Sequence, residues 1–329
     1  MKQSVNDKLA LFIANVQAIK GDFKWKHSGT KRLAALMYAL ENKPIDCNAI
    51  RESYSLIKDS AGVFSMVRGN MSLCIAAKLS LNENRKQLIN DTMTVYDRMK
   101  DAKFRASDFL AVAAFLIAAN TERHNHQNTI ERAREFYEGM KKHRWFHTGQ
   151  DDYIFSVMLA LSDIDPISGS DRIEQLHQRL LPEFKRAGGN SVQALCQMLA
   201  LGGKSDEALD HLITLRNSLR SKKIKLDKAY TLPSLGALSL LPVDGDTLVS
   251  DILEAQSYLR SQKGFSPFTV STQELLLFSS GIISYAYSED VKGTIAASIS
   301  TGIASIIIAQ QISMIVLMTV SASAAAASS

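Results

Sequence analysis

Two kinds of hydrophobic segment alternate along the chain. Segments of the first kind are apolar on every side, and they occupy residues 33–40, 72–81, 109–119, 153–162, 192–201, 232–241 and 274–283. They are rich in Ala, Leu and Met rather than Val, Ile and Thr, which favours helices over buried strands. Because a helix without a polar face must be buried, we expect these helices to form the interior.

Segments of the second kind have one apolar stripe and one polar face, which predicts amphipathic outer helices. They occupy residues 49–59, 88–101, 129–142, 172–186, 208–223 and 248–263. The stripe of 129–142, for example, consists of Ile130, Ala133, Phe136, Tyr137 and Met140. The segment 172–186 contains Pro182, which should kink or split its helix.

The amino-terminal segment has the same helical spacing of apolar residues, at Leu9, Phe12, Ile13, Val16 and Ile19. Polar side chains interrupt it, so we interpret it as an amphipathic opening helix rather than a signal peptide.

The alternation of apolar and amphipathic segments recurs roughly every 40 residues, which is the signature of a repeat architecture. It predicts an all-α fold in which repeated helical hairpins form a single domain over residues 1–292. Stacked hairpins bury their apolar helices either in an open α-solenoid or in a closed α/α ring. The pattern leaves both arrangements open, and it matches neither the tetratricopeptide nor the ankyrin consensus.

Composition and charge narrow the functional classes. The 329 residues carry 38 basic and 33 acidic side chains, a net charge of only +5, and no RNA-recognition or zinc-finger signature is present. These features disfavour nucleic acid as a partner. The three cysteines, Cys47, Cys74 and Cys196, lack metal-binding or redox spacing. We therefore expect reduced thiols and a cytoplasmic protein.

The turns that enter the apolar helices carry the candidate site. Since equivalent positions of a repeat line one face, we expect these turns to share an edge of the stack. Their candidate ligand-binding residues are Arg68, Asn70, Arg105, Asp108, Gln150, Asp151, Asp152 and Asn190. Helix capping is an alternative explanation for several polar residues at these turns, namely Asn70, Ser107, Asp151 or Asp152, Asn190 and Thr231.

The residue types at these turns suggest more than one kind of ligand. Arginines near helix N-termini favour a small anionic ligand. Asp108, Asp151 and Asp152 are candidates for binding a divalent cation. Our leading hypothesis is a helical-repeat protein that binds a small anionic ligand or a protein partner at this edge. An alternative is a metal-dependent α/α-ring enzyme that acts on a phosphorylated substrate, although no catalytic residue can be named.

The carboxy-terminal segment 293–329 has no charged residue, and its centre, 303–320, is mostly apolar. Length and composition make 303–320 a membrane-spanning candidate. The glutamines Gln310 and Gln311 are costly in hydrocarbon, which favours a terminal helix packed on the hairpins. Self-association through this helix is a third alternative. If 303–320 does enter a membrane, the protein is a membrane-anchored scaffold, which is the remaining functional hypothesis.

Several runs of sequence resemble a known bacterial family. They include FSMVRGNMSL, FRASDFLAVAA, TGQDDYIFSVMLALSD, GGNSVQAL, YTLPSLGALSLLPVD and LRSQKGF, together with the Ala/Ser tail. The family is known as domain of unknown function 4003, and the resemblance covers nearly the whole chain. It implies a cytosolic protein of the Gram-positive type, and it supplies no activity, cofactor or catalytic residue.

Overall fold

The computed structural model describes residues 1–62, 65–144, 148–202 and 206–289, and it contains no β-strand within these ranges. The described chain forms α-helices joined by turns and a few short 3-10 helices. The predicted all-α fold is confirmed.

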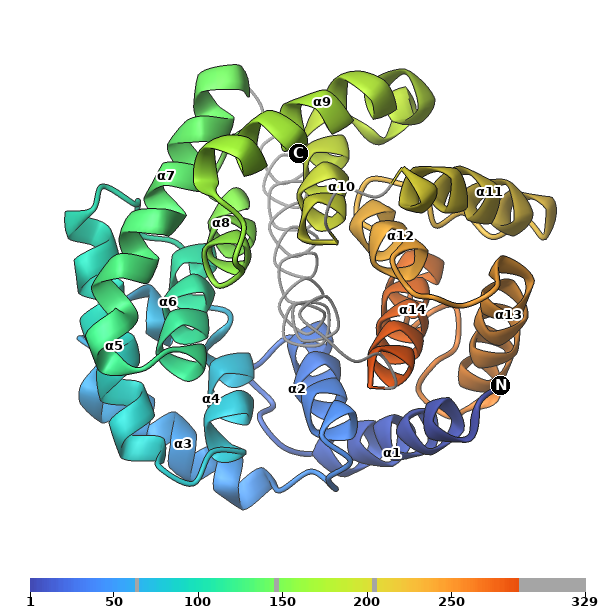
Figure 1. Cartoon of the computed structure of the whole chain (residues 1–329). Coiled ribbons are helices and arrows are strands. Elements are labelled where there is room, and N and C mark those ends of the chain that lie inside the picture. Colours follow the sequence, from blue (N-terminus) through green and yellow to red (C-terminus); the bar gives the residue numbers. More distant parts are fainter. Residues whose placement is uncertain (63–64, 145–147, 203–205, 290–329) are drawn as a thin grey trace, which may run out of the picture.

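The helices lie in two layers around a circle, with the odd-numbered helices outside and the even-numbered helices inside (Figure 1). The outer helices are α1 (Gln3–Ile19), α3 (Cys47–Ser60), α5 (Arg85–Asp101), α7 (His126–Arg144), α9 (Pro166–Phe184), α11 (Glu207–Ser221) and α13 (Gly245–Ser261). The inner helices are α2 (Ser28–Leu40), α4 (Ser72–Ser80), α6 (Asp108–Asn120), α8 (Asp152–Ala160), α10 (Gly189–Leu201), α12 (Leu232–Ser239) and α14 (Thr272–Ser288).

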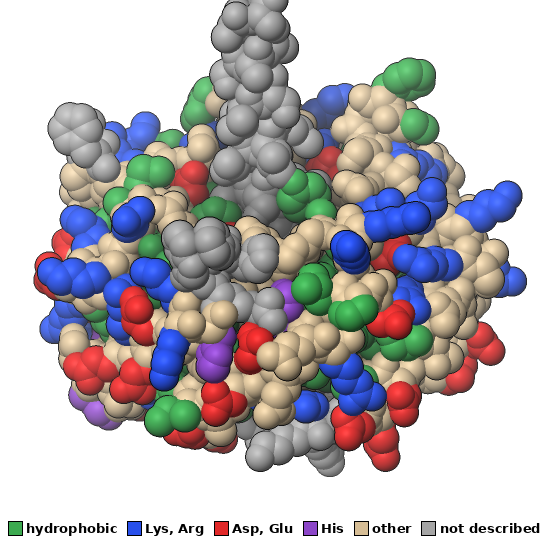
Figure 2. All heavy atoms as spheres, turned by 90° about the horizontal axis from the view of Figure 1, so that it is seen from above, with side chains coloured by type: hydrophobic (Ala, Val, Ile, Leu, Met, Phe, Trp, Pro, Cys, Tyr) green, Lys and Arg blue, Asp and Glu red, His purple; other side chains and the backbone are tan. Residues whose placement is uncertain are grey.

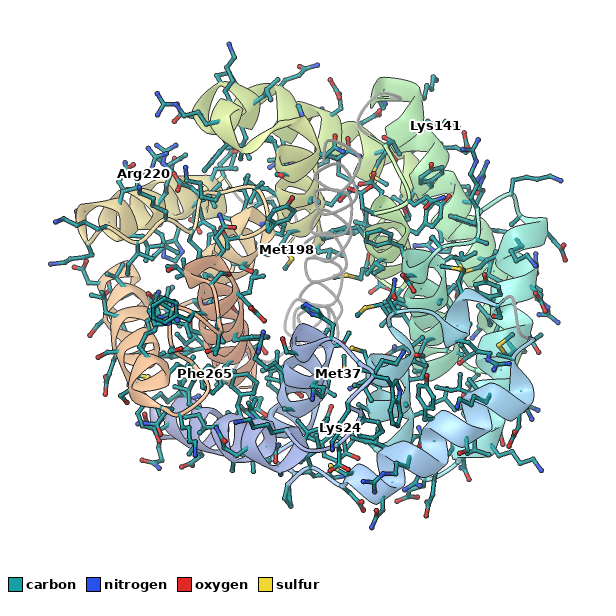
Figure 3. The ribbon with its side chains drawn as sticks, turned by 180° about the vertical axis from the view of Figure 1, so that it is seen from behind. Lys24, Met37, Lys141, Met198, Arg220 and Phe265 are labelled. Carbon is teal, nitrogen blue, oxygen red and sulfur yellow. The ribbon has the colours of Figure 1, made fainter. Side chains whose placement is uncertain are left out.

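Burial follows the two hydrophobic patterns. In the inner helix α6 every residue from Leu110 to Ile117 is buried. In the outer helix α7 the predicted stripe is buried, including Phe136 and Met140. Figure 3 shows Met37 and Met198 of the inner layer toward the middle and Lys141 and Arg220 of the outer layer at the periphery. Each apolar segment therefore lies on an inner helix and each amphipathic segment on an outer one.

Short acidic caps begin several of the outer helices. The Asp46 carboxylate accepts hydrogen bonds from the first-turn N–H groups of Asn48 and Ala49, both at 2.9 Å. Asp165 and Asp244 cap α9 and α13 in the same way. Such caps satisfy N–H groups that have no partner inside the helix.

Pro182 does not split α9 in the middle. The helix runs past it and ends two residues later at Phe184, where a short 3-10 turn follows. Pro182 lies in the last turn, so the backbone hydrogen bond that it cannot donate is lost close to the natural end of the helix.

The last helical hairpin packs against the first. Helix α14 contacts α1 and α2, and α13 contacts α1. The ring of Phe12 on α1 lies 5.6 Å from that of Phe265 and 5.1 Å from that of Phe278, measured between centroids. We call this contact between the first and last hairpins the seam.

A buried lysine also crosses the seam. The Lys8 ammonium group donates hydrogen bonds to the Leu40 carbonyl oxygen at 2.9 Å and to Asn42 Oδ1 at 2.8 Å. It forms an ion pair with Glu289 at 3.2 Å and lies over the ring of Tyr285. One side chain of α1 therefore links the ends of α2 and α14.

The predicted helix 303–320, with the rest of segment 293–329, lies outside the described residues. Among the helices that the structure does describe, none has the length and hydropathy needed to span a membrane.

Candidate ligand-binding edge

Side-chain contacts join the starts of neighbouring inner helices. The Lys26 ammonium group, before α2, donates to the Gly69 carbonyl at 3.2 Å and to Ser72 Oγ at 2.7 Å, where α4 begins. Asn70 Nδ2 donates to Asp108 Oδ2 at 3.2 Å, where α6 begins. The turns that enter α2, α4 and α6 therefore lie side by side.

The same kind of contact continues along this edge. The Arg105 backbone N–H, before α6, donates to Tyr153 Oη on α8 at 3.1 Å. At the start of α8, Asp152 Oδ1 accepts a hydrogen bond from Gln193 Nε2 on α10 at 3.1 Å. Arg32 of α2 pairs with Glu274 of α14, with 2.8 Å between Arg32 Nη2 and Glu274 Oε1.

Capping explains only one of the polar residues for which it was predicted. Ser107 Oγ caps α6 by accepting from the Leu110 N–H at 3.1 Å. The N-caps of α4 and α10 are Met71 and Gly188, which displaces Asn70 and Asn190 from that role. Asp151 and Thr231 are at N-cap positions, but neither side chain makes a cap hydrogen bond. Most of these side chains therefore do not cap the helix that they precede.

The contacts found in the structure join the eight predicted site residues only in pairs. Asp108 and Asp152 are buried, whereas Arg105, Asn70 and Asn190 are exposed, and Arg68, Gln150 and Asp151 are intermediate. The structure brings Asn70 to Asp108 and places Asp151 beside Asp152. Within the described ranges, no three His, Cys, Asp or Glu side chains approach closely enough to hold a metal ion.

Among these residues, Asp152 has the pKa that is shifted furthest from its ordinary value. Its Oδ1 accepts from Gln197 Nε2 at 2.6 Å and from Gln193 Nε2, and its Oδ2 accepts from the Gly149 N–H at 2.8 Å. Burial, together with the charge of Asp151, raises the pKa of Asp152 to about 7, and the hydrogen bonds oppose that rise only in part. The amide oxygens of both glutamines are buried without a hydrogen-bond partner among the described residues.

Asp108 has a similar environment at the start of α6. Burial raises the pKa of its carboxyl group, and Oδ1 has no hydrogen-bond partner in the described chain. A Cβ atom at position 69 would lie 2.5 Å from this oxygen, so Gly69 is required for the close approach.

A cavity of about 490 Å³ lies where α2 and the loop before α14 meet the end of α1. Its size is within the range of small-molecule sites. Three of its lining residues are basic, and none of the described lining residues is acidic. The lining residues are Val16, Gln17, Ile19, Lys20, Ser28, Lys31, Arg32, Gly264, Phe268 and Thr269.

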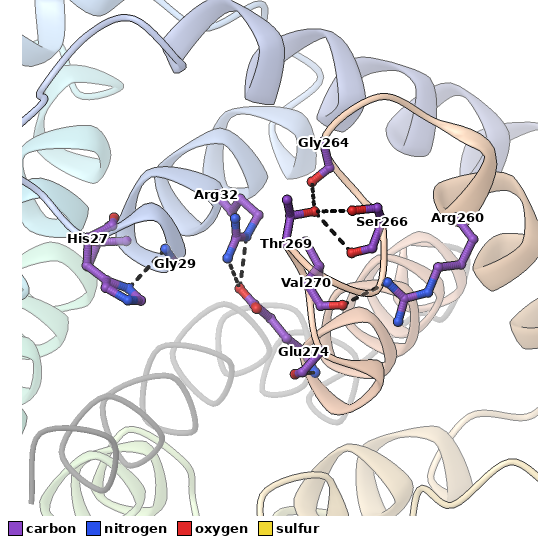
Figure 4. A network of polar contacts seen from close by, with 11 residues as sticks. His27, Gly29, Arg32, Arg260, Gly264, Ser266, Thr269, Val270 and Glu274 are labelled. Atoms are coloured by element: carbon purple, nitrogen blue, oxygen red, sulfur yellow. Dashed lines mark hydrogen bonds and ion pairs between the residues drawn. The ribbon is translucent and has the colours of Figure 1, made fainter. Parts of the chain in front are cut away.

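Two of the cations in this cavity are held in place. Arg32 Nε and Nη2 both donate to Glu274 Oε1, at 2.9 and 2.8 Å (Figure 4). Lys31 Nζ donates to the backbone carbonyl oxygens of Lys20 and Asp22, at 3.0 and 3.3 Å. Lys31 therefore has a fixed geometry, and no carboxylate in the described part of the chain forms an ion pair with it. The side chain of Lys20 is exposed.

Sequence reasoning missed these cavity residues. It considered the polar residues of the turns, whereas Lys20 directly follows α1 and Lys31 and Arg32 lie in the first two turns of α2. The positions of the basic residues could have indicated this cluster. One basic residue follows α1 and two lie near the start of α2, so a helical hairpin formed by α1 and α2 brings the three together. Their meeting with the 264–269 loop depends on a contact across the seam.

Comparison with known proteins identifies the family. The family model described as "Protein of unknown function (DUF4003)" matches residues 15–312. The chain belongs to this family. It is similar to "Uncharacterized protein YeaA" of Bacillus subtilis (strain 168), with 22% identity over 250 residues, which cover 73% of this chain and 74% of that protein. No solved structure matches the chain.

Membership of this family confirms the resemblance drawn from the sequence runs. Neither the family description nor the relative's name assigns a reaction or a ligand. A function for this protein must therefore be inferred from the side chains and the cavity at the edge where the inner helices begin.

Proposed function

We propose that this protein binds a small anionic ligand in the cavity between α1, α2 and the loop that precedes α14. The observation that carries the proposal is a cavity of ligand size lined by Lys20, Lys31 and Arg32. The cavity lies where α2 begins, and none of the eight residues that the turn pattern suggested as a ligand site lines it.

The charge of the cavity favours an anion. Lys20, Lys31 and Arg32 contribute three positive charges, and Glu274 neutralises one of them. The first turn of α2, which supplies Ser28, adds the positive end of a helix dipole and N–H groups that lack intrahelical acceptors. An anion placed here gains from fixed positive charge that the fold has already organised.

We further propose that residues 1–292 form one closed α/α ring of about 40-residue hairpins in preference to an open solenoid. The seam contacts of α1 with α13 and α14 support closure. We place the protein in the cytoplasm because Cys47, Cys74 and Cys196 are all free thiols.

The proposal is tested by titrating the full-length protein with pyrophosphate in a calorimeter. We expect saturable binding that Lys20→Gln and Lys31→Gln each weaken at least fivefold and that added salt also weakens. Lys24→Gln is the matched control, since Lys24 is an exposed lysine nearby in the chain that does not line the cavity.

Two results would contradict a binding site at this cavity. One is the absence of measurable pyrophosphate binding at millimolar ligand. The other is binding that all three lysine variants weaken equally, because that result would show general attraction to a basic surface.

A further inference from the structure

Phe268 is one of the residues that line the cavity between α1, α2 and the loop before α14, and 100% of its surface is accessible to solvent. A single exposed apolar side chain is common on protein surfaces, but this one lines a cavity whose other side chains include cations, and there it offers an apolar contact to a ligand. Its neighbour Phe265, three residues earlier, is completely buried against Phe12. One short loop therefore fixes one phenylalanine inside the core and presents another to solvent.

The loop that carries Phe268 is held by hydrogen bonds rather than left as a loose tip. Arg260 Nη1 donates to the carbonyl oxygens of Phe265 at 2.8 Å and Val270 at 2.7 Å. Thr269 Oγ1 donates to the Gly264 carbonyl at 2.9 Å (Figure 4). Because hydrogen bonds hold the backbone on both sides of Phe268, the point from which its side chain extends is fixed beside the cavity, which lowers the entropic cost of binding.

The cavity also has an apolar wall. Val16 and Ile19 of α1 line it together with Phe268, while Lys20 and Lys31 supply charge. A simple inorganic anion would use only the charged part. The combination of an aromatic side chain, aliphatic side chains and cations matches a ligand with an anionic group joined to an apolar ring.

We propose that the cavity binds an organic anion, a phosphate or carboxylate, whose attached aromatic ring stacks on Phe268. This inference rests on the proposed function, because the anionic group occupies the site formed by Lys20, Lys31 and Arg32. Aromatic rings pair in offset-stacked or edge-to-face geometry, and an exposed ring leaves both geometries available. The ring contact adds affinity and selects among anions.

The experiment compares 1-naphthyl phosphate, inorganic phosphate and 1-naphthol by calorimetry on the full-length protein. We expect 1-naphthyl phosphate to bind at least tenfold more tightly than inorganic phosphate, and 1-naphthol to bind weakly. Phe268→Ala should remove most of the tenfold gain, so that the affinities for 1-naphthyl phosphate and inorganic phosphate approach each other. Lys20→Gln should weaken both phosphates by the same factor.

Folding should not obscure this test, because the exposed ring of Phe268 contributes little packing that the substitution could remove. The matched control is Trp25→Ala, which removes a 69% exposed aromatic side chain that does not line the cavity. Inorganic phosphate binding with no gain from the naphthyl ring would overturn the inference and leave the proposed function standing. Equal binding of 1-naphthol and 1-naphthyl phosphate, or no binding of either phosphate, would overturn both.

Discussion

At the scale of single residues, the fold keeps Asp152 away from water beside another acid, Asp151. Three hydrogen-bond donors reach its carboxylate, yet its pKa is still raised to about 7 because desolvation outweighs them. The oxygens of the two glutamine amides that donate to it have no hydrogen-bond partner in the part of the chain that the structure describes. A buried acceptor without a donor costs free energy, so this arrangement destabilises the native state when Asp152 is ionised.

The titration of Asp152 predicts how stability depends on pH. The unfolded carboxyl has a pKa of about 4, whereas the folded one has a pKa of about 7. Between these values the native state holds a proton that the unfolded state has lost. The resulting stabilisation is therefore complete at low pH and is lost as the pH rises through 7. Asp151 and Asp108, whose pKa values are also raised, act in the same direction.

We expect Asp152→Asn to stabilise the protein by about 1 kcal/mol at pH 8 and to have progressively less effect toward pH 5. The neutral amide removes the buried charge. With its oxygen accepting from the Gly149 N–H, its NH2 group donates to the oxygens of Gln193 and Gln197 once these two amides turn over. Urea unfolding between pH 4 and 8.5 measures the effect. Asp165→Asn is the control, because Asp165 is an exposed cap whose pKa is lowered by the Ser168 N–H. A variant profile parallel to the wild type would show that Asp152 titrates alike in the folded and unfolded chain.

At the scale of elements, α7 and α9 approach closely through small residues. A Cβ atom at Gly169 would lie 2.7 Å from Phe136 Cε1 and 2.8 Å from Ile164 Cγ2. Phe136 is completely buried, so its ring has little freedom to move aside. The glycine therefore sets the spacing of two outer helices, although glycine is a poor helix former.

We expect Gly169→Ala to destabilise the protein by about 1–3 kcal/mol, because overpacking outweighs the better helix propensity of alanine. Thermal and urea unfolding test this expectation. Gly245→Ala at the start of α13 is the comparison, since a Cβ there meets only His211 Nε2 at an ordinary 3.8 Å. A Gly169→Ala protein as stable as Gly245→Ala would mean that α7 and α9 separate at little cost.

At the scale of the whole molecule, the seam decides whether the helical hairpins close. Figure 2 shows Lys and Arg side chains interspersed with Asp and Glu on the face seen from above, so charge of one sign does not dominate there. The seam differs, because Lys8 and Arg32 from the first hairpin meet Glu274 and Glu289 from the end of the chain's described part. Charge complementarity of this kind fixes the register between elements distant in sequence.

We expect Lys8→Met to cost about 2 kcal/mol, because it leaves the Leu40 carbonyl and Asn42 without their buried donor. Lys78→Met is the matched control: Lys78 pairs with Glu41 at 3.1 Å, much as Lys8 pairs with Glu289, but it is more exposed. An exposed pair contributes less than about 1 kcal/mol. Urea unfolding compares the two, and X-ray scattering reports whether the proposed ring opens. Equal losses of stability would show that the seam lysine is an ordinary surface ion pair.

The helices and their two layers could be predicted from the sequence. Apolar residues at helical spacing lie on one face of the helix, and that face is buried. The apolar run of α6 and the stripe of α7 are examples. The shared edge of the turns followed from the regular spacing of the segments. The predicted N-caps Asn70 and Asn190 were wrong. The first residue of a helix depends on the direction from which the chain enters it, which the sequence pattern does not give.

Only the tertiary structure decided which of these side chains meet. The cavity combines Lys20 and Lys31 with Phe268, residues separated by most of the described chain, through the packing of the last hairpin on the first. Two of the hydrogen bonds to the buried Asp152 carboxylate likewise come from α10, two helices further along. Periodicity specifies which face of a helix turns inward. Which helices distant in sequence pack against each other depends on the packing and charge of the whole chain. A local pattern of residues does not contain that information.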